Sequence, residues 1–208
     1  MAAGGTGYNP ARLSDTARPA GARVTERMGK EELARQLRDV ALLRGEFTLR
    51  SGRKSNYYFD KYRFETSPEL LKGVARELAA MLPKGVQRLA GAELGGVPLA
   101  TAVALETGLP FVIVRKESKG YGTEKRIEGE MAPGEHVVLI EDVATTAGAA
   151  LKAVQALRDA GAGTVSVLLV LDRQEGAAES FGEAGVPFRA LFTSESLGIE
   201  PAGGKEKA

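Results

Sequence analysis

Two acidic residues, Glu141 and Asp142, stand where a buried strand should end in the stretch VVLIEDVATTAGAA. The apolar residues before them predict the strand, and the small residues after them lead into a helical pattern. Backbone N–H groups at a helix start bind anions, and small side chains let a phosphate approach them. Acids would repel that phosphate, so they must serve sugar hydroxyls, a metal ion or a developing positive charge. A phosphorylated sugar meets both demands, although an ordinary strand–helix connection can look the same.

The composition limits the chemistry that this chain can perform. It has 208 residues, no cysteine and a single histidine, His136, which excludes thiol nucleophiles and disfavours Ser-His-Asp triads and multi-histidine metal sites. Lys plus Arg (28) nearly balances Asp plus Glu (27), so we expect neither a nucleic-acid partner nor a membrane surface partner. The longest apolar runs, such as VLLVL, are too short to span a bilayer. Chemistry then rests on Lys, Arg, Asp, Glu, hydroxyls and backbone, which favours an anionic ligand.

Helical and strand patterns alternate along the chain. We expect helices at 30–43, 67–82, 97–108, 148–162 and near 176–184, two short strands within 46–60, and strands at 88–94, 110–116, 136–142, 165–173 and 187–194. Strands that are continuous apolar runs between helices predict a parallel sheet covered on both faces. Ligands bind such sheets at the carboxyl ends of the strands. The loops of interest therefore follow Ala92, Val114, Ile140 and Leu171.

The two ends of the chain lack apolar periodicity. We expect a disordered leader at 1–28, one domain at 29–198, and a flexible tail at 199–208. The segment 116–135 is polar and is expected to form a loop.

The stretch VVLIEDVATTAG resembles the phosphoribosyl-pyrophosphate (PRPP) signature of type I phosphoribosyltransferases. Three other stretches, GEFTLRSGRKSNYYFD (45–60), RKESKGYGTEKRIEG (115–129) and LDRQEG (171–176), resemble orotate phosphoribosyltransferases in order and spacing. Four matching segments are more specific than one. The resemblance implies an α/β class, the type I phosphoribosyltransferase fold, with a central mostly parallel sheet flanked by helices and a small N-terminal hood.

The resemblance also implies a reaction and its partners. Orotate and PRPP would give orotidine 5′-monophosphate and pyrophosphate, a step of pyrimidine nucleotide synthesis. Mg²⁺ would be the cofactor and would be held mainly through PRPP, with no metal site built from protein side chains. The family's flexible loop, here 115–130, reaches the neighbouring subunit's site, which implies a homodimer. We expect a cytoplasmic enzyme.

Site residues follow from the same motifs. The resemblance assigns catalysis to Lys119, which stabilises the leaving pyrophosphate, together with Glu141 and Asp142. The expected PRPP contacts are Leu94, Gly95, Arg115, Lys116, Lys119, Tyr121, Glu141, Asp142, Val143, Ala144, Thr145, Thr146, Ala147, Gly148 and Ala149. The expected orotate contacts are Arg50, Tyr58, Phe59, Thr145 and Arg173.

The chain departs from the family pattern in the signature loop. Ala147 occupies a position that is commonly Gly, and it would be strained if that position needs a positive φ. Ala149 stands where Ser or Thr is common, which removes a hydroxyl donor for the 5′-phosphate. We therefore expect weaker PRPP binding rather than lost activity. Gly95 stands where some relatives place lysine, and Tyr121 where histidine is frequent.

Other functions stay open. A phosphoribosyltransferase for another base would share the PRPP loop, but a neutral base needs no carboxylate partner such as Arg173. A non-catalytic PRPP-binding regulator would need an effector surface, which the balanced charge disfavours. A degenerate paralogue with an impaired loop is a further alternative.

Overall fold

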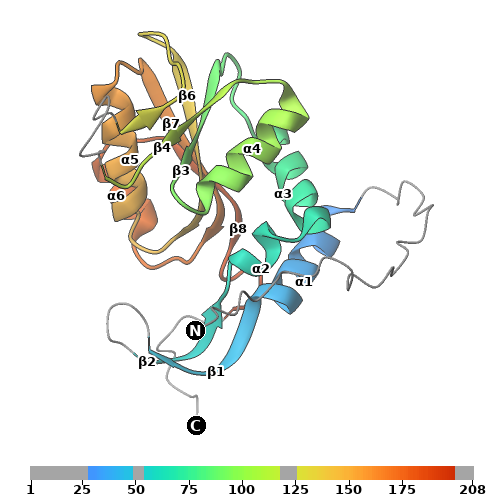
Figure 1. The fold of residues 1–208 in the computed structure, drawn as a ribbon. Coiled ribbons are helices and arrows are strands. Elements are labelled where there is room, and N and C mark those ends of the chain that lie inside the picture. Colours follow the sequence, from blue (N-terminus) through green and yellow to red (C-terminus); the bar gives the residue numbers. More distant parts are fainter. Residues whose placement is uncertain (1–27, 49–53, 118–125, 200–208) are drawn as a thin grey trace, which may run out of the picture.

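The central element of the fold is a six-stranded sheet. The computed structural model describes residues 28–48, 54–117 and 126–199. The strands run in the order β5-β4-β3-β6-β7-β8, and only the β4–β5 pair is antiparallel (Figure 1). Their bounds are β3 (Arg88–Ala92), β4 (Phe111–Val114), β5 (Ile127–Glu128), β6 (His136–Ala144), β7 (Thr164–Asp172) and β8 (Phe188–Thr193). The carboxyl ends of β3, β4, β6 and β7 therefore meet at one edge, as the apolar runs predict.

Helices cover both faces of this sheet. α3 (Pro68–Ala80) and α4 (Gly96–Thr107) lie on one face, and α5 (Gly148–Asp159) and α6 (Ala177–Glu183) lie on the other (Figure 1). Neighbouring residues of β6 serve different layers, since Ile140 belongs to the apolar cluster under α3 and α4 whereas Leu139 belongs to the cluster under α5. Both residues are fully buried, which explains why this strand is apolar without alternation.

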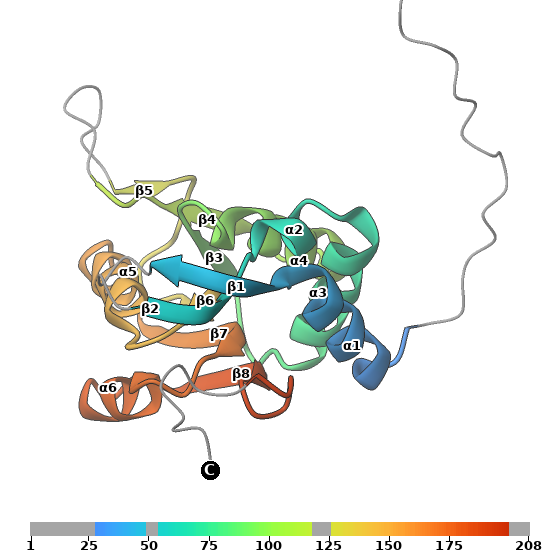
Figure 2. The same ribbon diagram turned by 90° about the horizontal axis from the view of Figure 1, so that it is seen from below.

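The N-terminal part forms a hood at the carboxyl edge of the sheet. It consists of α1 (Lys30–Ala41), β1 (Leu42–Thr48), β2 (Lys54–Phe59) and the four-residue helix α2 (Tyr62–Glu65). Strands β1 and β2 pair as an antiparallel hairpin. The hairpin lies below the main sheet in Figure 1 and crosses in front of the sheet when it is seen from below in Figure 2. The hood therefore faces the loops that follow the parallel strands.

Three local features differ from the sequence-based expectations. The first helix ends at Ala41, because Leu42 and Leu43 pair with β2 as the start of β1. The segment 116–135, expected to be a loop, contains the short strand β5. The helix α2 has only four residues, too few to show a helical period.

The end of the described chain belongs to the core. Leu197 and Ile199 are 2% and 4% exposed and pack in the cluster that includes residues of α1 and the hairpin. The hood is thus held by both early and late segments. Within the described residues, no helix is both long enough and apolar enough to cross a membrane.

Glycines let the first turn of α4 lie directly on the sheet. A Cβ atom on Gly96 would lie 2.6 Å from the carbonyl oxygen of Ile140, and one on Gly91 would lie 2.5 Å from the carbonyl oxygen of Gly96. No real Cβ atom fits at such distances, so glycine is required at both positions. The turn before α4 is consequently fixed against β3 and β6.

Candidate active site

Residues 145–149, which comprise the connection from β6 to α5 and the first two residues of α5, are called the phosphate loop here. Glu141, Asp142, Val143 and Ala144 form the last part of β6, directly before it. Within the loop, Thr145, Thr146, Gly148 and Ala149 are exposed. A cavity of about 110 Å³ is lined by Glu141, Val143 and residues 144–150. The structure thus brings together the predicted contacts of this motif around one small hollow at a helix start.

Ala147 has φ = 58° and ψ = 3°, which is the left-handed conformation. The sequence predicts strain at this alanine if its φ is positive. Such a conformation costs a non-glycine residue about 1–2 kcal/mol. Two contributions to the folding free energy favour alanine over glycine at this position. Glycine costs about 0.5–1 kcal/mol more in chain entropy on folding, and a buried methyl group stabilises the folded state by about 0.8 kcal/mol. Ala147 is only 5% exposed, so its methyl group is buried. The strain is therefore largely offset.

Four ionisable side chains, Lys61, Glu65, Glu141 and Asp142, gather beside the phosphate loop and are called the charged cluster here. The Lys61 ammonium group donates a hydrogen bond to Oδ2 of Asp142. Asp142 is 1% exposed and Glu65 is 4% exposed. Both carboxyl oxygens of Glu65 and Oε2 of Glu141 are buried without a hydrogen-bond partner. The acidic pair predicted from the sequence therefore meets two further ionisable groups from the hood.

Sequence reasoning missed Lys61 and Glu65. They lie four residues apart around α2, a spacing that places two side chains on the same side of a helix. That spacing was the available signal, but only the fold brings Lys61 to a carboxylate 81 positions later.

Burial governs the protonation of the charged cluster. It raises the pKa of Glu65 to about 8, and the negative charge of Asp142 adds to this shift while Lys61 opposes it. Burial and Asp142 likewise raise the pKa of Glu141 to about 8. Burial is the largest single effect on Lys61 and would lower its pKa, but the charge and the hydrogen bond of Asp142, with smaller effects of Tyr62 and Glu65, together raise the pKa. At neutral pH, protonated Glu65 and Glu141 leave Lys61 to balance Asp142, so the cluster has little net charge to repel an anion.

The turn between β3 and α4 lies against the charged cluster. A Cβ atom on Gly95 would lie 1.8 Å from Oδ2 of Asp142. Leu94 is 64% exposed, and the Glu93–Leu94 peptide bond is cis. The carboxylate of Glu93 accepts a hydrogen bond of 3.0 Å from the backbone N–H of Lys116. The predicted residues Leu94, Gly95 and Lys116 are therefore at the same edge as Asp142.

The structure describes the two ends of the loop 115–130, which are residues 115–117 and 126–130. Arg115 follows β4, where its backbone N–H donates to the carbonyl of Arg126 at 2.8 Å. Its guanidinium group lies 3.6 Å from Oε1 of Glu128 on β5. Lys119, Tyr121 and Arg50 lie outside the described residues.

Arg173 follows β7 and faces the hairpin. Its backbone N–H donates to the carbonyl of Ala144 at 2.9 Å, which ties it to the end of β6. Its guanidinium group donates to the hydroxyl of Tyr57 at 2.6 Å, lies 5.2 Å from the centre of that ring, and pairs with Glu175 at 2.9 Å. The cation predicted for the base is thus held between the sheet and the hood.

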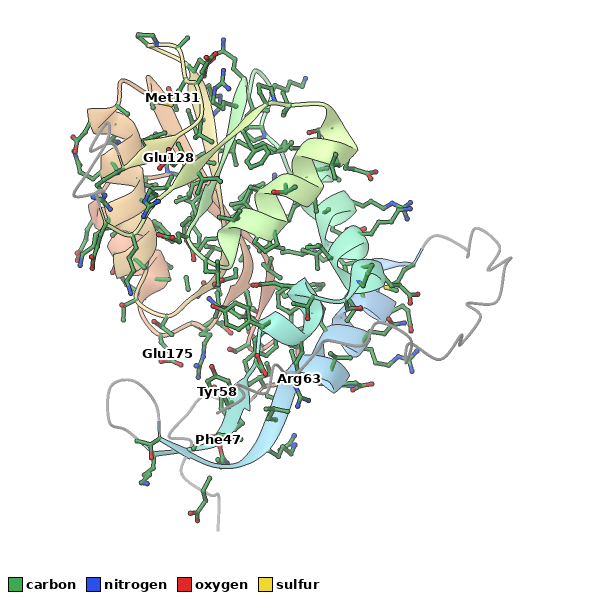
Figure 3. The ribbon with its side chains drawn as sticks, viewed as in Figure 1. Phe47, Tyr58, Arg63, Glu128, Met131 and Glu175 are labelled. Atoms are coloured by element: carbon green, nitrogen blue, oxygen red, sulfur yellow. The ribbon has the colours of Figure 1, made fainter. Side chains whose placement is uncertain are left out.

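The two aromatic residues predicted beside the base lie on opposite faces of β2. Tyr58 is 44% exposed and packs against Phe47 of the hairpin, whereas Phe59 is 7% exposed and packs against Phe64 of α2. Figure 3 shows Tyr58 beside Phe47, below Glu175. Because side chains alternate along a strand, Tyr57 and not Tyr58 contacts Arg173.

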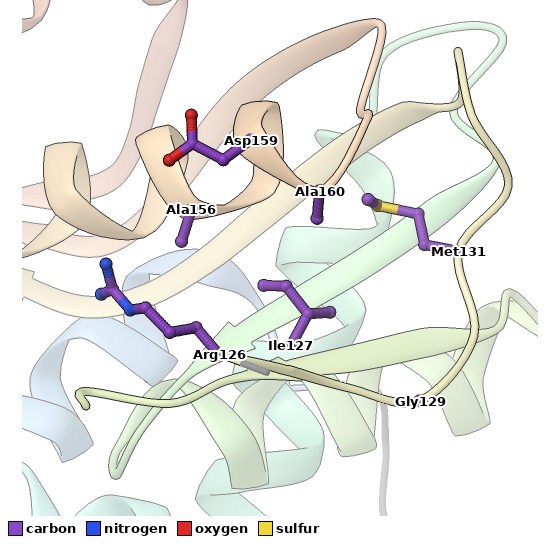
Figure 4. A pocket seen from close by; sticks show the side chains of 7 residues that line it. All are labelled: Arg126, Ile127, Gly129, Met131, Ala156, Asp159 and Ala160. Carbon is purple, nitrogen blue, oxygen red and sulfur yellow. The ribbon is translucent and has the colours of Figure 1, made fainter. Parts of the chain in front are cut away.

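A second cavity is larger than the one at the phosphate loop. It has a volume of about 390 Å³ and lies between β5 and the C-terminal half of α5 (Figure 4). Its lining consists of Arg126, Ile127, Gly129, Met131, Ala156, Asp159 and Ala160. It contains none of the predicted site residues, so size alone does not mark the site. Among the described residues, no group of three His, Asp or Glu side chains is placed to hold a metal ion.

The chain is similar to known proteins over most of its length. The family model for the phosphoribosyl transferase domain matches residues 68–184. The orotate phosphoribosyltransferase of Methanocella arvoryzae is 48% identical over 82% of this chain and 98% of its own. That of Halobacterium salinarum is 52% identical over 74% of this chain and 87% of its own. The crystal structure of Mycobacterium tuberculosis orotate phosphoribosyltransferase in complex with PRPP superimposes with a TM-score of 0.70, at 32% identity, over 82% of this chain and 99% of that one.

Proposed function

The chain belongs to the orotate phosphoribosyltransferases, and we propose that the edge site described above transfers the 5-phosphoribosyl group of PRPP to orotate. The products are orotidine 5′-monophosphate and pyrophosphate, in pyrimidine nucleotide synthesis. One observation supports this assignment most strongly. The backbone N–H of Arg173 donates to the carbonyl of Ala144, the residue before the phosphate loop. The residue that carries the cation for a carboxylated base therefore lies beside the phosphate site.

The chemistry asks for positioning and charge stabilisation rather than a protein nucleophile. As the C1–O bond breaks, positive charge develops on the ribose and negative charge on the pyrophosphate. The phosphate loop would fix the 5′-phosphate while the anomeric carbon moves toward the base. Glu141 and Asp142 would meet the ribose hydroxyls. Orotate N1 then forms the new bond to C1 and loses its proton, which the pyrophosphate can accept as it leaves with the electron pair of the broken bond.

Each remaining residue role is part of the proposal. Arg115 and Lys116, at the end of β4, would face the pyrophosphate, and Lys119 would stabilise it as it leaves. On the base side we assign Tyr57 together with Arg173, in keeping with their hydrogen bond. Arg50 keeps its proposed contact with orotate.

Mg²⁺ is proposed to enter the site with PRPP and to be held mainly by the pyrophosphate oxygens. The described residues suit this arrangement, because Lys61 already pairs with the Asp142 carboxylate. When bound, the ion would supply positive charge to the leaving group. A homodimer in which loop 115–130 serves the neighbouring site is also proposed. The cytoplasm is the proposed location, since PRPP is a polyanion that does not cross membranes freely.

A direct assay tests the reaction. Purified protein is mixed with PRPP, Mg²⁺ and one base at a time (orotate, uracil, hypoxanthine or adenine), and consumption of each base is followed. We expect turnover with orotate alone. Turnover with uracil or hypoxanthine but not orotate would contradict the proposal, and PRPP binding without any turnover would favour a regulator.

Arg173→Ala tests the base side in the same assay. A hydrogen bond to a charged group contributes about 1.5–3 kcal/mol, so the KM for orotate should rise about tenfold or more while the KM for PRPP changes little. Arg173→Lys is the control that keeps the charge without the paired donors, and it should lose less. Equal increases in both KM values would show that Arg173 does not bind the base.

A further inference from the structure

Lys61 lies in the charged cluster but has no substrate contact in the proposed reaction. It belongs to the hood, whereas its partner Asp142 belongs to the central sheet. The Lys61 side chain is 30% exposed and the Asp142 side chain is 2% exposed. One side of the ammonium group therefore rests on a buried carboxylate, while the lysine remains accessible from the solvent side.

Three separate segments converge on this ion pair. A Cβ atom on Gly95 would lie 1.8 Å from Oδ2 of Asp142 and 2.9 Å from Oε1 of Glu65. The turn that carries Gly95 thus lies against both carboxyl groups. The turn also packs closely on β3 and β6 through Gly91 and Gly96, so the ion pair lies against a tightly packed segment of backbone.

Buried carboxyl oxygens in the same place lack partners. Both oxygens of Glu65 and Oε2 of Glu141 are buried without a hydrogen bond. Buried polar groups in native proteins are normally paired, so an unpaired set beside an accessible cation indicates a place for a polar ligand. The ligand has to offer hydroxyl groups to these oxygens and negative charge to the lysine. A ribose that carries a pyrophosphate on C1 offers both.

We propose that Lys61 is a further PRPP-binding residue, which holds the Asp142 carboxylate for the ribose hydroxyls and donates to the pyrophosphate side of the same substrate. The inference rests on the proposed function. A lysine ammonium group has three donors, and Asp142 takes one of them. The charge also matters, since Asp142 without Lys61 would place an unbalanced anion next to a polyanionic substrate.

Lysine variants test the proposal. Lys61→Met should raise the KM for PRPP about tenfold or more, as expected for a lost charged hydrogen bond, and change the KM for orotate less than about twofold. Lys72→Met is the matched control, because Lys72 is exposed on α3, away from the site. Lys61→Arg keeps the charge and should recover most of the affinity. Equal PRPP KM values for Lys61→Met and Lys72→Met would overturn the proposal, and so would an equal rise in the orotate KM.

A second measurement uses the unsubstituted protein and does not depend on a variant that folds. Lysines are acetylated with acetic anhydride, with and without PRPP and Mg²⁺, and modification is quantified by mass spectrometry. PRPP should protect Lys61 severalfold and leave Lys72 and Lys152 unchanged. Equal acetylation of Lys61 in both samples, at a PRPP concentration that saturates orotate turnover, would overturn the proposal. The wild-type turnover assay is read first, so failure of the overall function is seen separately.

Discussion

The phosphate loop and the charged cluster adjoin each other at the end of β6, yet they are built in opposite ways. No charged side chain occurs between residues 143 and 151, so the loop can bind an anion only through backbone N–H groups and hydroxyls. The charged cluster gathers four ionisable side chains around the bare backbone of Gly95. One region is a continuous stretch of chain, and the other is assembled from α2, the turn before α4 and the end of β6.

This difference predicts how each region responds to change. Backbone N–H groups survive a substitution of the side chain, so the phosphate loop should tolerate small replacements. The charged cluster depends on close packing between three segments, so a single added methyl group should disturb it. The four predictions below test that contrast in order of expected effect.

Gly95→Ala should have the largest effect. Its Cβ atom would lie 1.8 Å from Oδ2 of Asp142, so either the turn or the carboxylate must move. A displacement of about 1 Å at a reacting site can cost on the order of 100-fold in rate, and we expect a loss of that order in kcat/KM for PRPP. Steady-state kinetics at saturating orotate measure it.

Gly182→Ala is the matched control, because a Cβ atom at Gly182 on α6 would meet nothing within 4 Å. It should leave kcat/KM within about twofold, since α6 lies outside the site and surface changes have small effects. If Gly95→Ala behaved like Gly182→Ala, the close approach of the turn to Asp142 would not matter for catalysis.

Glu65→Gln should alter the pH dependence of stability. Burial raises the pKa of Glu65 to about 8, so the folded state binds this proton more tightly than the unfolded chain does. That contribution to stability is fully present below the ordinary pKa of 4.5 and is lost as the pH rises through 8. Wild-type Tm should therefore fall between about pH 4.5 and pH 8.

The glutamine variant cannot ionise, so its Tm should fall less, by about 2–4 °C for each kcal/mol of retained stability. Glu141 still ionises in this variant, and some decline should remain. Glu69→Gln, at an exposed position on α3, is the control and should follow the wild type. Parallel Tm curves for wild type and Glu65→Gln would mean that Glu65 is charged at neutral pH.

Ala149→Ser should strengthen PRPP binding modestly. Ala149 is exposed at the start of α5, so a serine hydroxyl there would be free to donate to a 5′-phosphate. One neutral hydrogen bond contributes about 0.5–1.5 kcal/mol, which corresponds to a KM for PRPP about two- to tenfold lower. Ala80→Ser on the exposed end of α3 serves as the control. An unchanged KM in Ala149→Ser would show that the phosphate does not reach this position.

Ala147→Gly should have the smallest effect. Removing the left-handed strain of about 1–2 kcal/mol is offset by greater chain entropy, about 0.5–1 kcal/mol, and by a lost buried methyl group, about 0.8 kcal/mol. The free energy of unfolding in urea should change by less than about 1 kcal/mol, a limit set by the same three terms. A much larger gain would show that the loop is strained more than its single positive φ of 58° indicates.

The contrast between the two regions also explains what the sequence could predict. The phosphate loop is contiguous, and the strand before it and the helix after it have strong periods, so the structure confirms that strand and that helix. Lys61 could not be assigned, because its partner lies 81 positions away and α2 is too short to show a period. Only the fold places them together.

The sequence also could not predict which face of the hairpin each aromatic side chain occupies. The run of three aromatic residues at 57–59 does not reveal which face of the strand is buried. Pairing with β1 decides this, since Leu43 lies opposite Tyr58 and Leu42 opposite Phe59. The result brings Tyr57 to Arg173 and leaves Tyr58 exposed.

The buried position of Ile199 has a practical consequence for anyone who extends or shortens this protein. Gly198 and Ile199 border a cavity of about 120 Å³ together with Leu42, Asn56 and Tyr57. Tyr57 in turn holds Arg173, so the last described residues support the side of the site assigned to the base. A stop codon before Leu197 would remove that support and weaken orotate binding, although every residue assigned to the ribose would be unchanged.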